Sequence, residues 1–119
     1  MINFSLNGKI ALITGGSRGI GEAIAYTLAE NGAHCILASR KIDALNQVSD
    51  TITGKGGQAT TIECNMSDMG QIRSLFDEVK KKFGKLDILV NNAAANPYFG
   101  EMLGAEEWAW DKTLAVNLK

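Results

Sequence analysis

Apolar residues follow two alternating patterns along the chain. Short runs of apolar and β-branched residues predict buried strands at about residues 10–14, 34–39, 59–64 and 86–91. Longer amphipathic segments predict helices at about residues 19–31, 42–53 and 67–83, and a last helix from about residue 105 that is still running at Lys119. Strand and helix therefore alternate throughout the chain.

This alternation predicts an α/β fold. Right-handed β-α-β units place the strands in a doubly wound parallel Rossmann sheet, in the order 3-2-1-4. The first helix should cover the sheet with Ile20, Ile24 and Leu28, which are spaced four residues apart. We expect residues 1–119 to be the amino-terminal part of a single domain, truncated after the fourth helix. The fourth strand would then be an open edge, and Leu114 and Leu118 would lack cover.

The composition is that of an ordinary globular domain. The 119 residues are 45% apolar and 21% charged, with a formal net charge of -1. This charge balance does not indicate a basic surface that would bind nucleic acid or an anionic membrane. No apolar run approaches the ~20 residues of a membrane span. Without a secretory signal, a cytoplasmic protein is expected. Cys35 and Cys64 match no metal or redox spacing and are interpreted as reduced core thiols, so no metal site is expected.

The segment Thr14-Gly15-Gly16-Ser17-Arg18-Gly19-Ile20-Gly21 directly follows the first predicted strand. Gly15 permits a sharp turn, Gly19 lets the backbone approach a diphosphate, and Gly21 allows the helix to pack closely on the strand. The free N–H groups and the dipole of the following helix favour an anion at its start. The segment therefore predicts a binding site for the diphosphate of a dinucleotide.

The end of the second strand indicates which dinucleotide is bound. An acidic side chain there would accept from a ribose 2′-hydroxyl, but this chain has Ser39-Arg40-Lys41. Arg40 can fork onto a 2′-phosphate while Arg18 approaches from the glycine turn, which favours NADP(H). The alternative is that both arginines are solvated surface cations.

Two motifs together resemble the classical short-chain dehydrogenases/reductases. These are Thr14-Gly15-X-X-X-Gly19-Ile20-Gly21 and, after the fourth strand, Asn91-Asn92-Ala93-Ala94. The resemblance covers essentially the whole chain and is greatest to the branch of NADP(H)-dependent carbonyl reductases. It implies hydride transfer between NADP(H) and a small-molecule carbonyl or alcohol, in an enzyme that is a dimer or tetramer when complete.

The resemblance also assigns residue roles, with two departures. Asn92 and its neighbours would support the nicotinamide-side ribose, and Asn117 matches the asparagine of an Asn-Ser-Tyr-Lys tetrad, whose backbone holds a water of the proton relay. Ala94 replaces the family's glycine and adds a methyl group near the nicotinamide. Asn65-Met66 replaces an aspartate that contacts adenine, so the Asn65 amide oxygen or the following N–H would make that contact. Asp87 also fits the pattern, in a structural role.

The rest of the tetrad is missing. The chain contains no Tyr-X-X-X-Lys, so the proton donor that carbonyl reduction requires is not among its residues. We therefore expect the cofactor half of a reductase, inactive alone. The alternatives are a truncated, non-catalytic module that binds NADP(H) or a partner, and a methyltransferase-like nucleoside binder, against which Arg40 argues.

Overall fold

The computed structural model describes residues 5–16, 19–92 and 114–117. It has five strands and three helices within this part of the chain. They are, in order, β1 (Ile10–Thr14), α1 (Gly19–Glu30), β2 (His34–Ser39), α2 (Ile42–Gly54), β3 (Gln58–Glu63), α3 (Met69–Phe83), β4 (Ile88–Asn91) and β5 (Leu114–Asn117).

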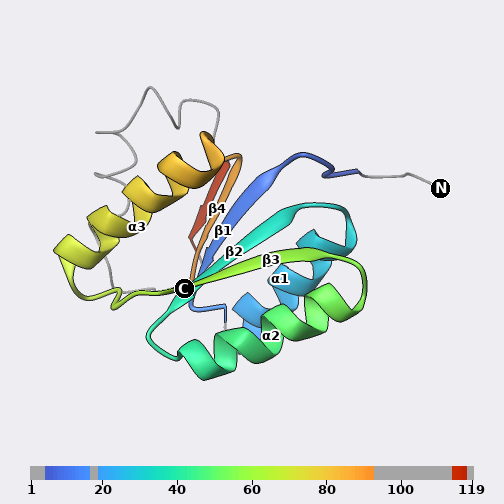
Figure 1. The fold of residues 1–119 in the computed structure, drawn as a ribbon, viewed down its shortest axis with the longest axis horizontal. Coiled ribbons are helices and arrows are strands. Elements are labelled where there is room, and N and C mark those ends of the chain that lie inside the picture. Colours follow the sequence, from blue (N-terminus) through green and yellow to red (C-terminus); the bar gives the residue numbers. More distant parts are fainter. Residues whose placement is uncertain (1–4, 17–18, 93–113, 118–119) are drawn as a thin grey trace.

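The strands form one parallel sheet in the order β3-β2-β1-β4-β5. The predicted order 3-2-1-4 and the α/β Rossmann fold are confirmed. Helix α3 covers one face of the sheet, and α1 and α2 cover the other (Figure 1). All the observed strand pairings are parallel, so the carboxyl ends of the strands meet along a single edge.

Alternating residues of the central strands build two separate cores. Leu12 and Ile36 face α3, where they meet Ile72, Phe76 and Val79. The intervening strand residues pack on the other face with α1 and α2; these are Ala11, Ile13, Cys35 and Leu37. Burial on both faces explains why β1 and β2 are continuous apolar runs.

The termini of α3 follow local sequence signals. Asp68 is the N-cap, and its carboxylate accepts from the backbone N–H groups of Gly70 and Gln71. The helix ends at Gly84, which adopts the left-handed conformation with φ 73°. Both ends of α3 are therefore set by residues of a type that favours a helix end.

The buried face of α1 differs from the prediction. The residues of this helix that are buried are Gly21, Ala25 and Ala29, whereas Ile20 is 62% exposed. Ile24 and Leu28 are only half-buried. The reason is distance: small side chains let the helix backbone lie close to the sheet, and larger residues at these positions would hold it away.

The predicted last helix is wrong for residues 114–117, which form strand β5. This strand pairs in parallel with β4, in the register Ile88 with Leu114 and Asn91 with Asn117. The pairing satisfies backbone groups of β4 that would otherwise form an open edge, so that expectation was also wrong. A short apolar segment does not distinguish helix from strand by periodicity alone. Leu114 is 63% exposed, as expected for a residue without cover. Leu118 and the earlier part of the predicted helix lie outside the described residues.

Candidate dinucleotide site

The carboxyl ends of β1, β2, β3 and β4 surround a cavity of about 580 Å³. In open parallel sheets ligands bind at this edge, at the point where the chain stops adding strands on one side of the first strand and begins to add them on the other side. Here that point lies between β1 and β4. The residues that line the cavity are Gly15, Gly19, Ile20, Ser39, Arg40, Lys41, Cys64, Asn65, Met66, Ser67 and Asn92.

The glycine turn forms the floor of this cavity next to α1. Gly15 and Gly19 have φ angles of 70° and 65°, in the left-handed region that side chains with a Cβ rarely adopt. Position 21 has no room for a side chain, because a Cβ there would lie 2.7 Å from the Gly15 carbonyl oxygen. At Gly15 and Gly19 the turn thereby presents backbone rather than a side chain to a ligand, next to the start of α1.

Hydrogen bonds join this turn to the end of β4. The Thr14 hydroxyl donates to the amide oxygen of Asn91 at 3.1 Å, with the Val90 carbonyl oxygen 3.4 Å away. The same hydroxyl accepts from the backbone N–H of Asn92, and the Asn92 amide nitrogen donates to the Gly15 carbonyl oxygen. Thr14 is fully buried and does not line the cavity, so it supports the turn from behind.

The end of β2 brings two cations to the cavity. Ser39 is buried, and its hydroxyl oxygen accepts from the backbone N–H of Lys41 at 2.9 Å. This bond holds the chain in a turn, and the exposed Arg40 and Lys41 then border the cavity. The carboxylate expected in an NAD(H) site is absent from the described lining of this cavity.

The loop after β3 forms another wall of the cavity. The amide oxygen of Asn65 accepts from the backbone N–H of Ser67 at 2.9 Å, which makes this side chain part of the loop. Sequence reasoning named Asn65 and Met66 but missed Cys64 and Ser67, which also line the cavity. Cys64 directly follows a parallel strand and Ser67 lies in the same loop, and that position was the signal that would have found them.

The two cysteines are free and lie in different cores. Burial raises the pKa of the Cys35 thiol to about 12. Burial, together with the nearby charge of Asp68, raises the pKa of the Cys64 thiol to about 11. Both thiols are therefore protonated at neutral pH, and their burial agrees with the interpretation as core thiols.

Several predicted site residues lie outside the described residues: Ser17, Arg18, Ala93 and Ala94. Asn117 is placed only through its backbone, at the carboxyl end of β5 beside Asn91. No cluster of metal-binding side chains occurs within residues 5–16, 19–92 and 114–117. No helix in the same part of the chain is long and apolar enough to cross a membrane.

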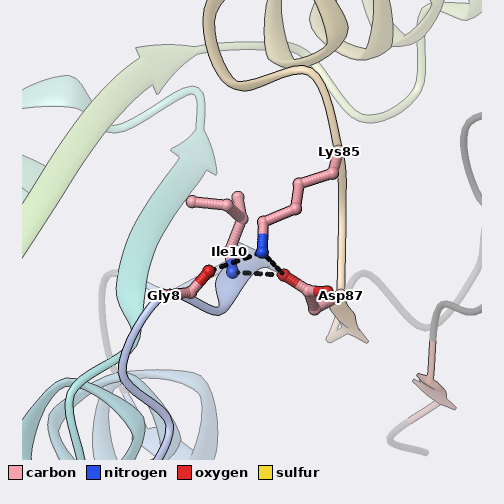
Figure 2. A network of polar contacts seen from close by, with 4 residues as sticks. All are labelled: Gly8, Ile10, Lys85 and Asp87. Carbon is pink, nitrogen blue, oxygen red and sulfur yellow. Dashed lines mark hydrogen bonds and ion pairs between the residues drawn. The ribbon is translucent and has the colours of Figure 1, made fainter.

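Asp87 lies at the opposite end of the sheet from the cavity. Figure 2 shows its carboxylate accepting from the Ile10 backbone N–H at 2.8 Å and pairing with Lys85 at 3.1 Å. The Lys85 ammonium also donates to the Gly8 carbonyl oxygen. This network ties the start of β1 to the start of β4, which agrees with the structural role expected for Asp87.

Comparison with known proteins identifies the family. The family model described as short chain dehydrogenase matches residues 9–119. The chain belongs to this family. Its members are oxidoreductases that use a nicotinamide cofactor, which agrees with a dinucleotide site at the carboxyl edge of the sheet.

Individual relatives agree with this assignment. Dehydrogenase/reductase SDR family member 4 from Homo sapiens is 41% identical over 114 residues, which are 96% of this chain and 41% of that protein. A metagenomic short-chain oxidoreductase, solved in complex with NADP, has a TM-score of 0.74 and 39% identity, covering 76% of this chain and 41% of that one.

A 7α-hydroxysteroid dehydrogenase, solved with NADH and 7-oxo glycochenodeoxycholic acid, has a TM-score of 0.72 and 43% identity over 76% of this chain and 35% of that one. The chain thus spans less than half the length of these relatives.

Proposed function

We propose that the chain binds NADP(H) and supplies the cofactor-binding part of a short-chain reductase that converts a carbonyl to an alcohol. The observation that carries this proposal is the position of Arg40 and Lys41 beside the cavity, at the strand end where the adenosine ribose binds. A 2′-phosphate there would receive charge-assisted hydrogen bonds, whereas an unphosphorylated ribose would leave these cations without an anion.

The described residues fit the dinucleotide. The glycine turn and the start of α1 would hold the diphosphate, and Asn92 lies on the β4 side, where the nicotinamide ribose would be. When bound, the reduced cofactor supplies a hydride to the carbonyl carbon. A proton must then reach the carbonyl oxygen from a donor such as the tyrosine of the family tetrad.

The remaining expectations belong to the same proposal. Residues 1–119 would be the amino-terminal part of a single Rossmann domain, acting in the cytoplasm on a small-molecule carbonyl as part of a homo-oligomer. Asn117 would take the tetrad asparagine's role. The relatives support a reductase in general terms, and those solved with a cofactor hold either NADP or NADH.

Titration of the chain with NADPH tests the proposal. A saturable change in NADPH fluorescence, with weaker binding of NADH, is the expected result. Because the sequence contains no Tyr-X-X-X-Lys, an added aromatic ketone should leave the bound NADPH unoxidised, and this tests the reductase step separately from binding. A chain that binds neither cofactor would refute the function, and equal affinity for both would refute the preference for NADP(H).

A further inference from the structure

We propose that Gln71, which does not line the cavity, positions the wall against which the adenine base binds. This inference rests on the proposed function. It concerns a ring of hydrogen bonds that connects the start of α3 to the loop after β3, and it gives this glutamine a role in ligand affinity.

The strand order determines where the base must lie. The diphosphate site is at the end of β1, and the ribose site is at the end of β2. Because the order continues to β3, a ligand that runs from β1 past β2 directs its base toward the loop after β3. Cys64, Asn65, Met66 and Ser67 line the cavity on that side.

Cys64 and Met66 pack on the core beneath α3, and polar contacts hold Asn65 and Ser67 in this wall. The backbone N–H of Asn65 donates to the Gln71 side-chain oxygen at 2.8 Å. The Asn65 carbonyl oxygen accepts from the Asp68 N–H, and its amide oxygen accepts from the Ser67 N–H. Gln71 therefore reaches back from α3 to the loop through a side-chain hydrogen bond.

The orientation of Gln71 is fixed by Asp68. The Gln71 amide nitrogen donates to one carboxylate oxygen of Asp68 at 3.3 Å, which leaves the amide oxygen for Asn65. The other carboxylate oxygen of Asp68 accepts from the backbone N–H groups of Gly70 and Gln71. The N-cap of α3 and the cavity wall thus share one network, in which each group has its complementary partner.

Gln71→Glu breaks this network with almost no change in shape. The new carboxylate still accepts from Asn65, but it has no donor for Asp68, and two negative charges then face each other. We expect the affinity for NADPH and for 2′,5′-ADP, which contains the adenine but no nicotinamide, to fall about fivefold. Gln71→Met removes both contacts without adding charge and is expected to have a similar effect.

A double variant that exchanges the carboxylate at position 68 and the amide at position 71 should restore cofactor binding. In the double variant D68N/Q71E, asparagine caps the helix as well as aspartate does, and its amide donates to the carboxylate introduced at position 71. The network and the net charge are restored, so both affinities should return to within about twofold of the original. Gln58→Glu makes the same chemical change at the far end of β3, and it should leave both affinities unchanged.

Thermal midpoints measured alongside the affinities separate positioning from a structural role. A lower midpoint with unchanged affinity in Gln71→Glu and Gln71→Met would overturn the proposal, as would failure of D68N/Q71E to recover binding. If the unaltered chain binds NADPH and the variants bind it equally well, only the role of Gln71 fails. If the unaltered chain does not bind NADPH, the proposed function fails as well.

Discussion

The side-chain amide of Asn92 donates to the Gly15 carbonyl oxygen at 3.3 Å and joins the loop after β4 to the glycine turn. Gly21 lies beneath this contact. A Cβ at Gly21 would lie 2.7 Å from the Gly15 oxygen and 2.9 Å from the Asn92 amide nitrogen. Gly21→Ala should therefore push the two loops apart, lower the free energy of unfolding by about 1–3 kcal/mol and weaken NADPH binding.

Gly54→Ala is the matched control for this prediction. Gly54 is the last residue of α2, and a Cβ there meets nothing within 4 Å. The control should be neutral or stabilising by up to about 1 kcal/mol, because alanine favours the helix. Denaturant unfolding and NADPH titration of both variants measure the difference, and equal behaviour would contradict the packing role of Gly21.

Much of the fold follows from local signals in the sequence. β1 and β2 have the predicted bounds, because apolar runs buried on both faces contrast sharply with the amphipathic helices. Asp68 and Gly84, which cap α3, are residue types that favour the two ends of a helix. Most residues that line the cavity are among those predicted to bind the cofactor, since parallel strands bring their carboxyl ends together.

The incorrect predictions concern features that local sequence patterns do not determine. The tight packing of α1 depends on the distance between helix and sheet, so the small stripe Gly21, Ala25 and Ala29 displaced the larger Ile20 from the buried face. β5 forms through pairing with β4, a contact between distant segments. The link between Gln71 and Asn65 is a side-chain contact across a turn, which no periodicity predicts.

Arg40→Asp tests the cofactor preference. Arg40 is exposed beside the cavity, and an aspartate would repel a 2′-phosphate but accept from a 2′-hydroxyl. Loss of a charge-assisted contact of about 1.5–3 kcal/mol should shift the ratio of NADPH to NADH affinity toward NADH by at least about tenfold. Lys9→Asp, an exposed charge reversal next to the start of β1, is the control and should leave the ratio unchanged.

Asp87→Ala tests the network at the other end of the sheet. The substitution leaves the Ile10 N–H without its carboxylate partner and should lower the free energy of unfolding by about 1–3 kcal/mol. The affinity for NADPH should not change, since the cavity lies at the opposite edge. Lys85→Met removes an exposed ion pair and an exposed hydrogen bond to the Gly8 carbonyl oxygen, and should cost about 1 kcal/mol or less. A loss of affinity in Asp87→Ala without a loss of stability would contradict the structural role.

The cysteines should be unreactive in the folded chain. Because burial raises the pKa of the Cys35 thiol to about 12 and that of the Cys64 thiol to about 11, few thiolates exist at pH 8. A thiol reagent such as dithionitrobenzoate should label neither residue on the timescale of minutes, and should label both after denaturation. Rapid labelling of Cys64, which borders the cavity, would show that this wall opens.

His34 makes stability depend on pH in a defined direction. Its Nε2 atom lies 2.7 Å from the Thr60 hydroxyl, and its ring packs edge-on against Phe83 with centroids 4.9 Å apart. Burial lowers the pKa of His34 below the ordinary value of 6.5. As pH falls through 6.5 the unfolded chain takes up a proton before the folded chain does, so the free energy of unfolding decreases.

His34 is the single histidine of the chain, so its imidazole resonances are unambiguous in an NMR titration. The titration should give a pKa below 6.5. In urea unfolding, the contribution of His34 to the free energy of unfolding should be constant above pH 6.5 and decrease below it. In His34→Gln that part of the decline should disappear, because glutamine does not titrate. A measured pKa above 6.5 would contradict the prediction, because the folded chain would then stabilise the imidazolium and the contribution of His34 to stability would increase as pH falls.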